Sequence, residues 1–503
     1  MSSYLMQMYE QIIVNNAPMN LEKILETEIQ EWLNSDKRKA MVKGEEYYEG
    51  KQDILEHYRY TIGDNGEKIR LQNVHNAQKV DNQYSIHLDK KVNYSFGKPI
   101  TIKTENDEYT AKLGEYFNPR FMKLLRRVGY EAMEGGVGFV HPHYDESGDL
   151  RFKLMDNKNV LPFYADEEGE IIDCYCWLHE RVEYEATKKK IIEMVDFVTR
   201  QGINRYERKD GRLKLIDQFS HLQVNGSPQN WERIPLIPFR YNAREIPMLT
   251  RVKSLQDGIN LILSVFEDNM MEDARNTILV IHNYDGEDVG RLRRNLASTG
   301  VIKVRSDGER RGGVETLSIE VNSENYKLIL QIFKTALIEN ARSFDAKDER
   351  IAGDPNMMTI RSMMLDMDND AEGMETEFQP ALQDLVWFIN QDLANRGKGL
   401  YDHESVEFIF NRDSFVNEAE VIANITASAG ILSKKTLLEQ HPWVDDVAEE
   451  LKRLEEEKEE SLQDMFGLTF RKELDDDEEE DSKREVLDPQ SGGGREKDPS
   501  KRA

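Results

Sequence analysis

Two pairs of alternating side chains are the residues of this sequence that could most readily bind a metal. Cys174 and Cys176 are two positions apart, as are His141 and His143, so in a strand each pair would lie on one face. A structural zinc site needs four ligands, and the chain holds no further cysteine. We therefore expect two buried free thiols, two surface histidines, and no metal or cofactor.

The motifs of the common enzyme classes are missing from the chain. It contains no G-x-x-x-x-G-K-[ST] phosphate loop, no H-E-x-x-H and no G-x-S-x-G. Gly136-x-Gly138 lacks the third glycine of a dinucleotide-binding loop and leads into a strand, which indicates a structural turn. Close pairs of carboxylates are no evidence of a catalytic site here, because a chain with 95 acidic residues contains such pairs by chance. The sequence therefore favours a protein that is not an enzyme.

One segment differs in charge from the rest of the chain. Residues 291–311 hold seven basic and two acidic residues, whereas the whole chain has a net charge of −28. Two interpretations stay open: a solvated basic face, or a docking patch for an acidic protein or a phosphate backbone. The basic residues are Arg291, Arg293, Arg294, Lys303, Arg305, Arg310 and Arg311.

The composition limits the class of protein. A chain of 503 residues that is 39% hydrophobic can build several cores, and its acidity makes it a poor general ligand for nucleic acid. No stretch approaches the roughly 20 apolar residues of a membrane helix. The first residues do not resemble a secretory signal, and two cysteines suit a reducing compartment. The acidic block 475–481 and the rest of the tail, 475–503, are expected to be disordered.

Apolar spacing predicts the order of elements in the first half. Residues 1–60 have helical spacing, and further helices are expected at 83–96 and 119–133. From Gly135 onward, alternating patterns and turn residues predict an antiparallel β region. Its strands are expected at 139–144, 150–154, 160–164 and 171–178, and β character continues through 190–206 and 213–219.

The second half is predicted to be mainly helical. Helices at 251–275 and 324–342 flank a small insertion with strands at 277–282, 301–305 and 314–319 and a helix at 288–297. A long helix should cover 358–395, with a kink or break near Glu377 because Pro380 lies inside it. A strand at 406–410 and helices within 416–466 follow. The methionines of the long helix favour a helix core or a subunit interface; they are Met357, Met358, Met363, Met364, Met367 and Met374.

The sequence of these segments resembles one protein family. The segments are KGEEYY at 43–48, LDKKVNYSFGKPIT at 88–101, a β region opening at Gly135, IPLIPF at 234–239, and an insertion with NYDG at 283–286 between two helices. A polar loop, a long helix and an acidic end complete the order. It is similar to that of bacteriophage portal proteins (head–tail connectors), in the branch from long-tailed phages of Bacillus-like hosts.

The resemblance implies an α+β, predominantly helical subunit that assembles into a ring of about twelve copies. It implies a wing at 1–240, stem helices at 251–275 and 324–342, and a clip at 276–318. It also implies a tunnel loop at 343–357, a long kinked helix at 358–395, a helical crown at 413–474 and a flexible tail at 475–503.

The same resemblance implies a channel for packaging and ejecting double-stranded DNA at one capsid vertex, in a particle assembled in the host cytoplasm. Implied partners are terminase, scaffolding and major capsid proteins and a head-completion adaptor; no membrane is implied, and divalent cations would affect assembly. The clip would dock terminase and the adaptor. Another virion scaffold or tail component, or a hydrolase, stays open as an alternative. The loop residues near DNA would be Asp345, Lys347, Asp348, Glu349 and Arg350.

Overall fold

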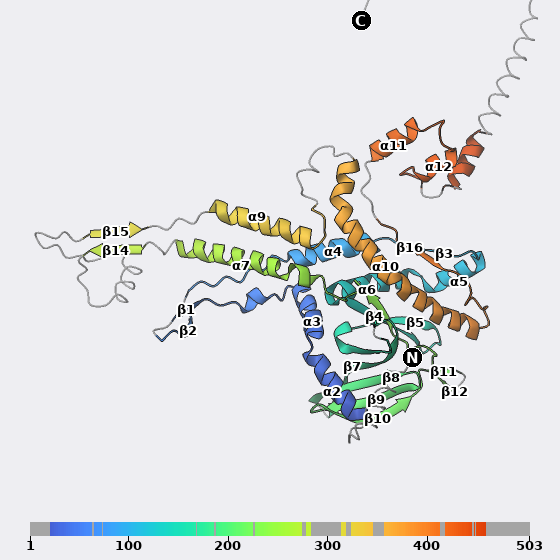
Figure 1. Ribbon diagram of the computed structural model, residues 1–503, viewed down its shortest axis with the longest axis horizontal. Coiled ribbons are helices and arrows are strands. Elements are labelled where there is room, and N and C mark those ends of the chain that lie inside the picture. Colours follow the sequence, from blue (N-terminus) through green and yellow to red (C-terminus); the bar gives the residue numbers. More distant parts are fainter. Residues whose placement is uncertain are drawn as a thin grey trace, which may run out of the picture. The chain divides into compact units, whose positions relative to one another are not determined.

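The computed structural model describes the chain as helices and strands that form two compact units (Figure 1). Unit 1 comprises Met1–Asp354 and Thr359–Ser414, and unit 2 comprises Pro355–Met358 and Phe415–Ala503. The described residues are 21–62, 65–72, 74–166, 168–185, 188–224, 227–273, 278–282, 313–317, 323–345, 357–412, 418–444, 447 and 449–458.

Asparagine side chains begin three helices of unit 1. Asn82, Asn106 and Asn118 each accept a hydrogen bond from a backbone N–H in the first turn of α4, α5 and α6, which supplies a partner that the helix itself lacks. Gly136 ends α6 in the left-handed conformation, with φ of 89°. The helices of this part are α2 (Leu21–Asn34), α3 (Asp36–Tyr48), the 3-10 helix η1 (Asp53–Glu56), α4 (Gln83–Phe96), α5 (Asp107–Tyr116) and α6 (Pro119–Gly135).

Antiparallel sheets follow α6. The largest has the strand order β10-β9-β8-β7-β6, and a three-stranded sheet has the order β13-β4-β5. Two of the two-stranded pairs are β1–β2, which lies before α4 in the sequence, and β11–β12. The strands are β1 (Tyr60–Ile62), β2 (Lys68–Arg70), β4 (Val137–Tyr144), β5 (Leu150–Met155), β6 (Val160–Tyr164), β7 (Ile172–Glu185), β8 (Lys188–Thr199), β9 (Gly202–Lys209), β10 (Arg212–Phe219), β11 (Leu222–Val224), β12 (Ser227–Gln229) and β13 (Ile237–Arg240); the 3-10 helix η2 (Asn157–Asn159) precedes β6.

Two helices of unit 1 run side by side in opposite directions (Figure 1). They are α7 (Leu249–Asp273) and α9 (Ser323–Asn340), and the described strands β14 (Ile278–His282) and β15 (Gly313–Leu317) pair between them in the sequence. Gly258 of α7 lies against the ring of Phe333, and Phe266, two turns later, contacts Tyr326 at 5.1 Å between ring centroids. A Cβ on Gly258 would meet that ring at 2.6 Å, so glycine permits the close approach.

The longest helix, α10 (Met357–Asn395), carries the main core of unit 1. Its buried residues Phe378, Leu382, Leu385 and Ile389 pack with those of α4, α5, α6 and α7 in one apolar cluster. A second cluster joins α2 and α3 to the large sheet. After α10, β16 (Glu407–Ile409) pairs with β3 (Thr101–Lys103). Unit 2 contains α11 (Glu418–Ala427) and α12 (Lys434–Glu439).

Most predicted elements are confirmed, with differences at three places. The β character expected over 190–206 belongs to two strands, because a turn at residues 200–201 joins β8 to β9. Of the kink or break expected near Glu377, a break is absent, since α10 continues through Pro380 as one helix. The short hairpin β1–β2 lies at residues 60–70, for which no element was predicted. The helix predicted at 288–297 and the strand at 301–305 lie outside the described residues.

Candidate functional site

A buried carboxylate in α10 joins four segments of unit 1. Asp370 Oδ2 accepts hydrogen bonds from Lys91 Nζ of α4 at 2.5 Å and from Tyr241 Oη at 2.6 Å. Its Oδ1 accepts from Arg251 of α7 at 3.1 Å and from Arg342, just after α9, at 3.3 Å. We call these five residues the ionic hub. One carboxylate here faces three cations, so both its oxygens are used.

Burial and charge set the ionisation of the hub. The side chains of Lys91 and Asp370 are 3% and 6% exposed. Burial lowers the pKa of Lys91, against the opposing effect of Asp370. Burial by itself would raise the pKa of Asp370, but Lys91, with Tyr241 and Arg251, brings it below its ordinary value. The carboxylate is therefore ionised, and its role is to hold cations in place.

Helix α4 also holds the first residues of the loop that follows α9. Lys91 Nζ donates to the carbonyl of Ala341 at 2.7 Å, and the Oγ of Ser343 lies 2.8 Å from His87 Nδ1. Lys90 Nζ donates to the carbonyl of Phe344 at 3.2 Å. Burial lowers the pKa of His87 to about 4, so its ring is neutral at neutral pH. Three positions of α4 that lie on one side thus fix the start of the loop.

The end of α9 is shaped for this attachment. Arg342 has a φ of 49°, in the left-handed region that few side chains adopt. Its backbone N–H donates to the Glu339 carbonyl, and that of Ser343 donates to the Ile338 carbonyl, both at 3.0 Å. The helix therefore ends with its carbonyls satisfied, and the chain turns toward α4.

A row of polar side chains on α7 binds the extended segment before α4 and the first turn of that helix. Gln256, Asn260, Ser264 and Asp268 recur every four residues and are all buried. Their oxygens accept the backbone N–H groups of Tyr84, Asp81, Lys79 and Ala77, in that order, at 2.7–3.0 Å. Four helical residues rise by about 6 Å, close to two residues of extended chain, so the two spacings match. We call this row the α7 ladder.

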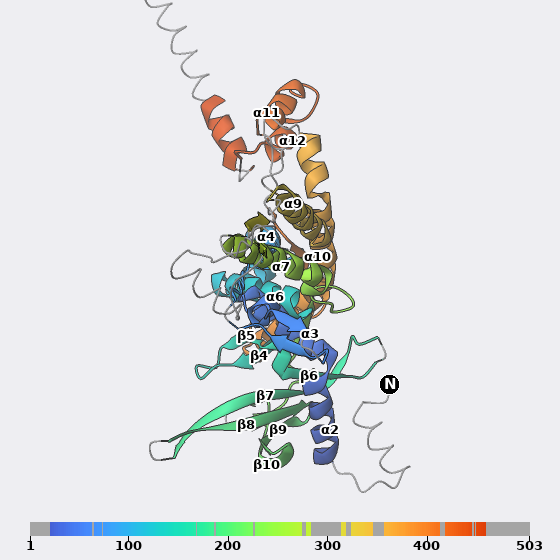
Figure 2. The ribbon, with the colours of Figure 1, turned by 90° about the vertical axis from the view of Figure 1, so that its left-hand side faces the viewer.

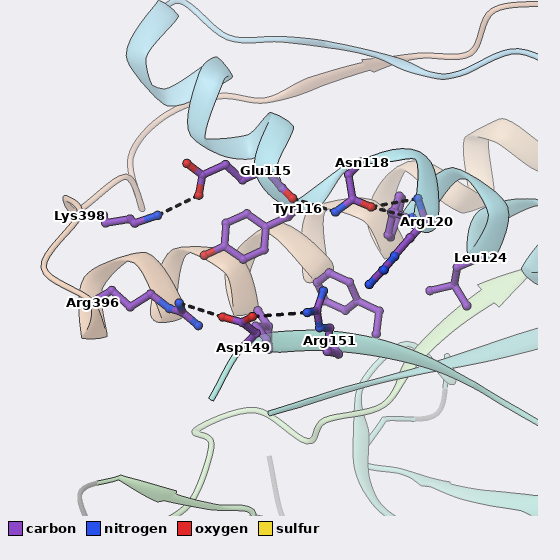
Figure 3. A pocket seen from close by; sticks show the side chains of 12 residues that line it. Glu115, Tyr116, Asn118, Arg120, Leu124, Asp149, Arg151, Arg396 and Lys398 are labelled. Carbon is purple, nitrogen blue, oxygen red and sulfur yellow. Dashed lines mark hydrogen bonds and ion pairs between the residues drawn. The ribbon is translucent and has the colours of Figure 1, made fainter. Parts of the chain in front are cut away.

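A cavity of about 370 Å³ lies between the α5–α6 turn, β5 and the end of α10 (Figure 3). Lys398 pairs with Glu115 at 2.8 Å, Arg396 with Asp149 at 3.3 Å, and Arg151 with Asp149 at 3.4 Å. The lining residues include no serine, cysteine or histidine. The cavity is therefore a hollow whose charged side chains are paired with one another.

Two glutamates of α6 have raised pKa values. Burial, followed by the nearby Asp156, raises the pKa of Glu131 to about 7. Burial, followed by Glu131, raises the pKa of Glu134 to about 8. Raised values can mark a general acid. The described residues contain no group of three or more His, Cys, Asp or Glu arranged to hold a metal ion.

The residues predicted to act at the site are only partly described. Asp345 is half-buried directly after Phe344, and its charge opposes the lowering of the His87 pKa. The other loop residues, Lys347, Asp348, Glu349 and Arg350, lie outside the described residues, as does the whole predicted docking patch: Arg291, Arg293, Arg294, Lys303, Arg305, Arg310 and Arg311. The tail 475–503 also lies outside them.

The predictions for the cysteine pair and the histidine pair have different outcomes. Cys174 and Cys176 are buried free thiols, as expected. The prediction of surface histidines is wrong for His141, which is half-buried beside the Pro235 carbonyl at 2.6 Å, and burial lowers its pKa to about 4. Met364, Met367 and Met374 are buried, as predicted for a helix core, whereas Met358 is exposed.

Sequence reasoning missed the ionic hub and the α7 ladder. One signal was available: Asp370 interrupts the apolar positions Met367, Ala371 and Met374 of α10, and a charge among apolar positions needs a partner. Nothing in the sequence identified Lys91 as that partner, since 279 residues separate the two.

Comparison with known proteins gives a consistent result. Residues 33–464 match the profile of the family described as "Phage portal protein, SPP1 Gp6-like". The portal protein of Bacillus phage SPP1 is 25% identical over 475 residues, which cover 93% of this chain and 92% of that protein. The portal protein of Clostridium phage phiCD119 is 26% identical over 435 residues, with coverages of 84% and 93%. Among the described residues, no helix has the length and apolar character to cross a lipid bilayer.

Proposed function

Because the chain belongs to the SPP1 Gp6-like family of phage portal proteins, we propose that it forms a ring of about twelve copies around a DNA channel at one capsid vertex. The match of residues 33–464 to this family carries the proposal. In the ring, the chain conducts DNA during packaging and ejection. It docks terminase first and a head-completion adaptor later, and contacts scaffolding and major capsid proteins during assembly.

The exposed faces of α7 and α9 support assembly. Leu261 and Val265 lie one turn apart on α7 and are exposed, as are Leu328 and Ile332 on α9. Large apolar side chains that recur on the outside of a helix pair favour contact with another chain. A closed ring needs two different surfaces that meet, and an antiparallel pair of helices offers two outer faces.

The contacts of α4 with the chain after α9 support the assignment of a tunnel loop to 343–357. The loop begins at Ser343 and Phe344, whose hydrogen bonds to His87 and Lys90 attach it to α4. A loop that touches moving DNA needs a fixed base. We infer that α4, which Lys91 of the hub ties to α10, gives the loop this base and that the loop's remaining residues meet the DNA.

The acidity of the chain suits a conduit. DNA phosphates bind basic surfaces, so a net charge of −28 per copy disfavours tight binding and allows DNA to slide. The same charge makes assembly sensitive to salt and to divalent cations. The basic segment 291–311 would then act as a local exception that attracts an acidic surface of terminase or the adaptor.

Negative-stain electron microscopy and native mass spectrometry of the purified full-length protein test the proposal. We expect pierced rings of about a dozen copies. Monomers or dimers alone, over a range of NaCl and MgCl₂ concentrations, would refute it. ATP hydrolysis should be absent without terminase, and activity that remains after terminase is removed would contradict a purely structural role.

Charge reversal tests the docking patch. The variant R291E/R294E/R305E should still form rings but should lose binding to terminase or the adaptor at low salt. A control variant, R244E, reverses an exposed basic residue before α7 and should leave both partners bound. Unchanged affinity of the triple variant for terminase and the adaptor would show that the patch is only a solvated basic face.

A further inference from the structure

The hairpin of β7 and β8 extends beyond its sheet. β6 pairs with β7 only as far as Trp177, and β9 pairs with β8 only from Glu193 onward. Between these limits β7 and β8 pair only with each other, in the register Arg181↔Ile192 to Glu185↔Lys188. Figure 2 shows this part projecting from the sheet. We call residues 181–185 and 188–192 the β7–β8 arm.

One face of the arm is apolar and uncovered. Val182 and Tyr184 alternate on β7, and Ile191 lies opposite Val182, so the three side chains share a face. Their exposed fractions are 45%, 73% and 53%. A two-stranded hairpin by itself is marginally stable in water. An apolar face on such a hairpin is therefore expected to be covered in the assembled protein.

The arm is also basic in an acidic chain. Residues 181–192 hold Arg181 and three consecutive lysines against two glutamates, a net charge of +2. Arg181 pairs with Glu183 at 2.5 Å. Lys188, Lys189 and Lys190 form no ion pair with the side chains that the structure describes. The arm thus complements the charge of the chain that carries it.

We propose that the β7–β8 arm docks on an acidic surface of the neighbouring copy in the ring, an inference that rests on the proposed ring. Neighbours in a ring meet through two different surfaces, so an arm on one copy can reach the body of the next. Val182, Tyr184 and Ile191 supply apolar contact, and the lysines supply attraction that weakens with salt. Lysines on an edge strand disfavour strand pairing, so the contact is made by side chains rather than by the backbone edge.

Photo-crosslinking of assembled rings tests the contact directly. Full-length protein carries p-benzoylphenylalanine in place of Tyr184, and a matched protein carries it in place of Leu400, which is 71% exposed. Irradiation should join copies to one another from position 184 and not from position 400. Peptide mapping should place the bond near acidic residues of the second copy. Rings that form normally but give no crosslink between copies from position 184 would refute the proposed contact of the arm. Absence of rings would instead count against the proposed function.

Substitution measures the contribution of the apolar face. The variant V182S/Y184S/I191S should raise the subunit concentration at half assembly about tenfold or more, because a loss of about 1.4 kcal/mol per interface corresponds to tenfold. The control L400S should leave it unchanged. Since the arm pairs only with itself, the far-UV spectrum of the triple variant should match that of the parent. A folded triple variant that assembles at the parent concentration overturns the inference.

Discussion

Replacing Asp370 by asparagine tests whether one buried carboxylate holds the segments of the ionic hub together. The variant keeps the shape of the side chain but removes its charge, which leaves Lys91, 3% exposed, without a counter-ion. Removal of one partner from a buried ion pair costs about 3–5 kcal/mol, because the remaining charge stays desolvated. We expect D370N to lose about this much free energy of unfolding.

The partner substitution should be milder. In K91M, Asp370 still accepts from Arg251, Arg342 and Tyr241, so its charge remains compensated. The variant loses the hydrogen bond to the Ala341 carbonyl, and a buried acceptor without a partner costs about 1–3 kcal/mol. The double variant K91M/D370N should lose less than the sum of the two single losses, since the groups interact directly.

Urea unfolding at neutral pH measures these differences, with all variants in the same assembly state because assembly adds to apparent stability. Hydrogen exchange should also accelerate at Ala341 and Ser343 in D370N. The control K398M removes the exposed pair with Glu115 and should cost less than about 1 kcal/mol. A D370N variant that is as stable as K398M would refute a structural role of the Asp370 charge. A larger loss of unfolding free energy in K91M than in D370N would refute it as well.

Three further predictions concern packing elsewhere in unit 1. The native state holds a proton on Glu134, whose pKa is raised from 4.5 to about 8. The contribution of this group to stability is fully present below pH 4.5 and is lost as the pH rises through 8. E134Q should therefore raise the melting temperature more at pH 9 than at pH 5. In G44A, the new Cβ would meet the Glu134 backbone oxygen at 2.1 Å, so thermal unfolding should show a loss of about 1–3 kcal/mol. The control G114A has open space in α5 and should be neutral or stabilising; equal effects in the two variants would contradict the clash. N260A removes one acceptor of the α7 ladder and should speed exchange of the Asp81 amide while costing about 1–3 kcal/mol, and an unchanged exchange rate would show that the ladder does not hold the segment.

Local patterns were enough to predict most helices and strands. The helix 83–96 was predicted from its apolar spacing with its observed bounds, and in the structure Asn82 caps it and Gly97 follows it. Alternating residues and turn-formers likewise located β4, β5 and β6 to within two residues at each end. The family was also visible in the sequence, since the order of segments survives at 25% identity. These features depend on neighbours in the chain, and a sequence records neighbours directly.

The tertiary structure decided which distant residues meet. β16 pairs with β3 across about 300 residues, and the three-residue strand β3 carried no signal of its own. In the sequence, Lys91 is one of two adjacent lysines in the amphipathic segment LDKKVNYSF. Only the packing of α4 against α10 shows that Lys91 is the buried one of these two lysines. His141 reads as a surface residue of an alternating strand until Pro235 and Tyr175 pack beside it. Burial sets the free energy of a charged group, and burial depends on residues far along the chain. The sequence by itself therefore determined the helices and strands. Only the tertiary structure decided which polar groups are buried and so need partners.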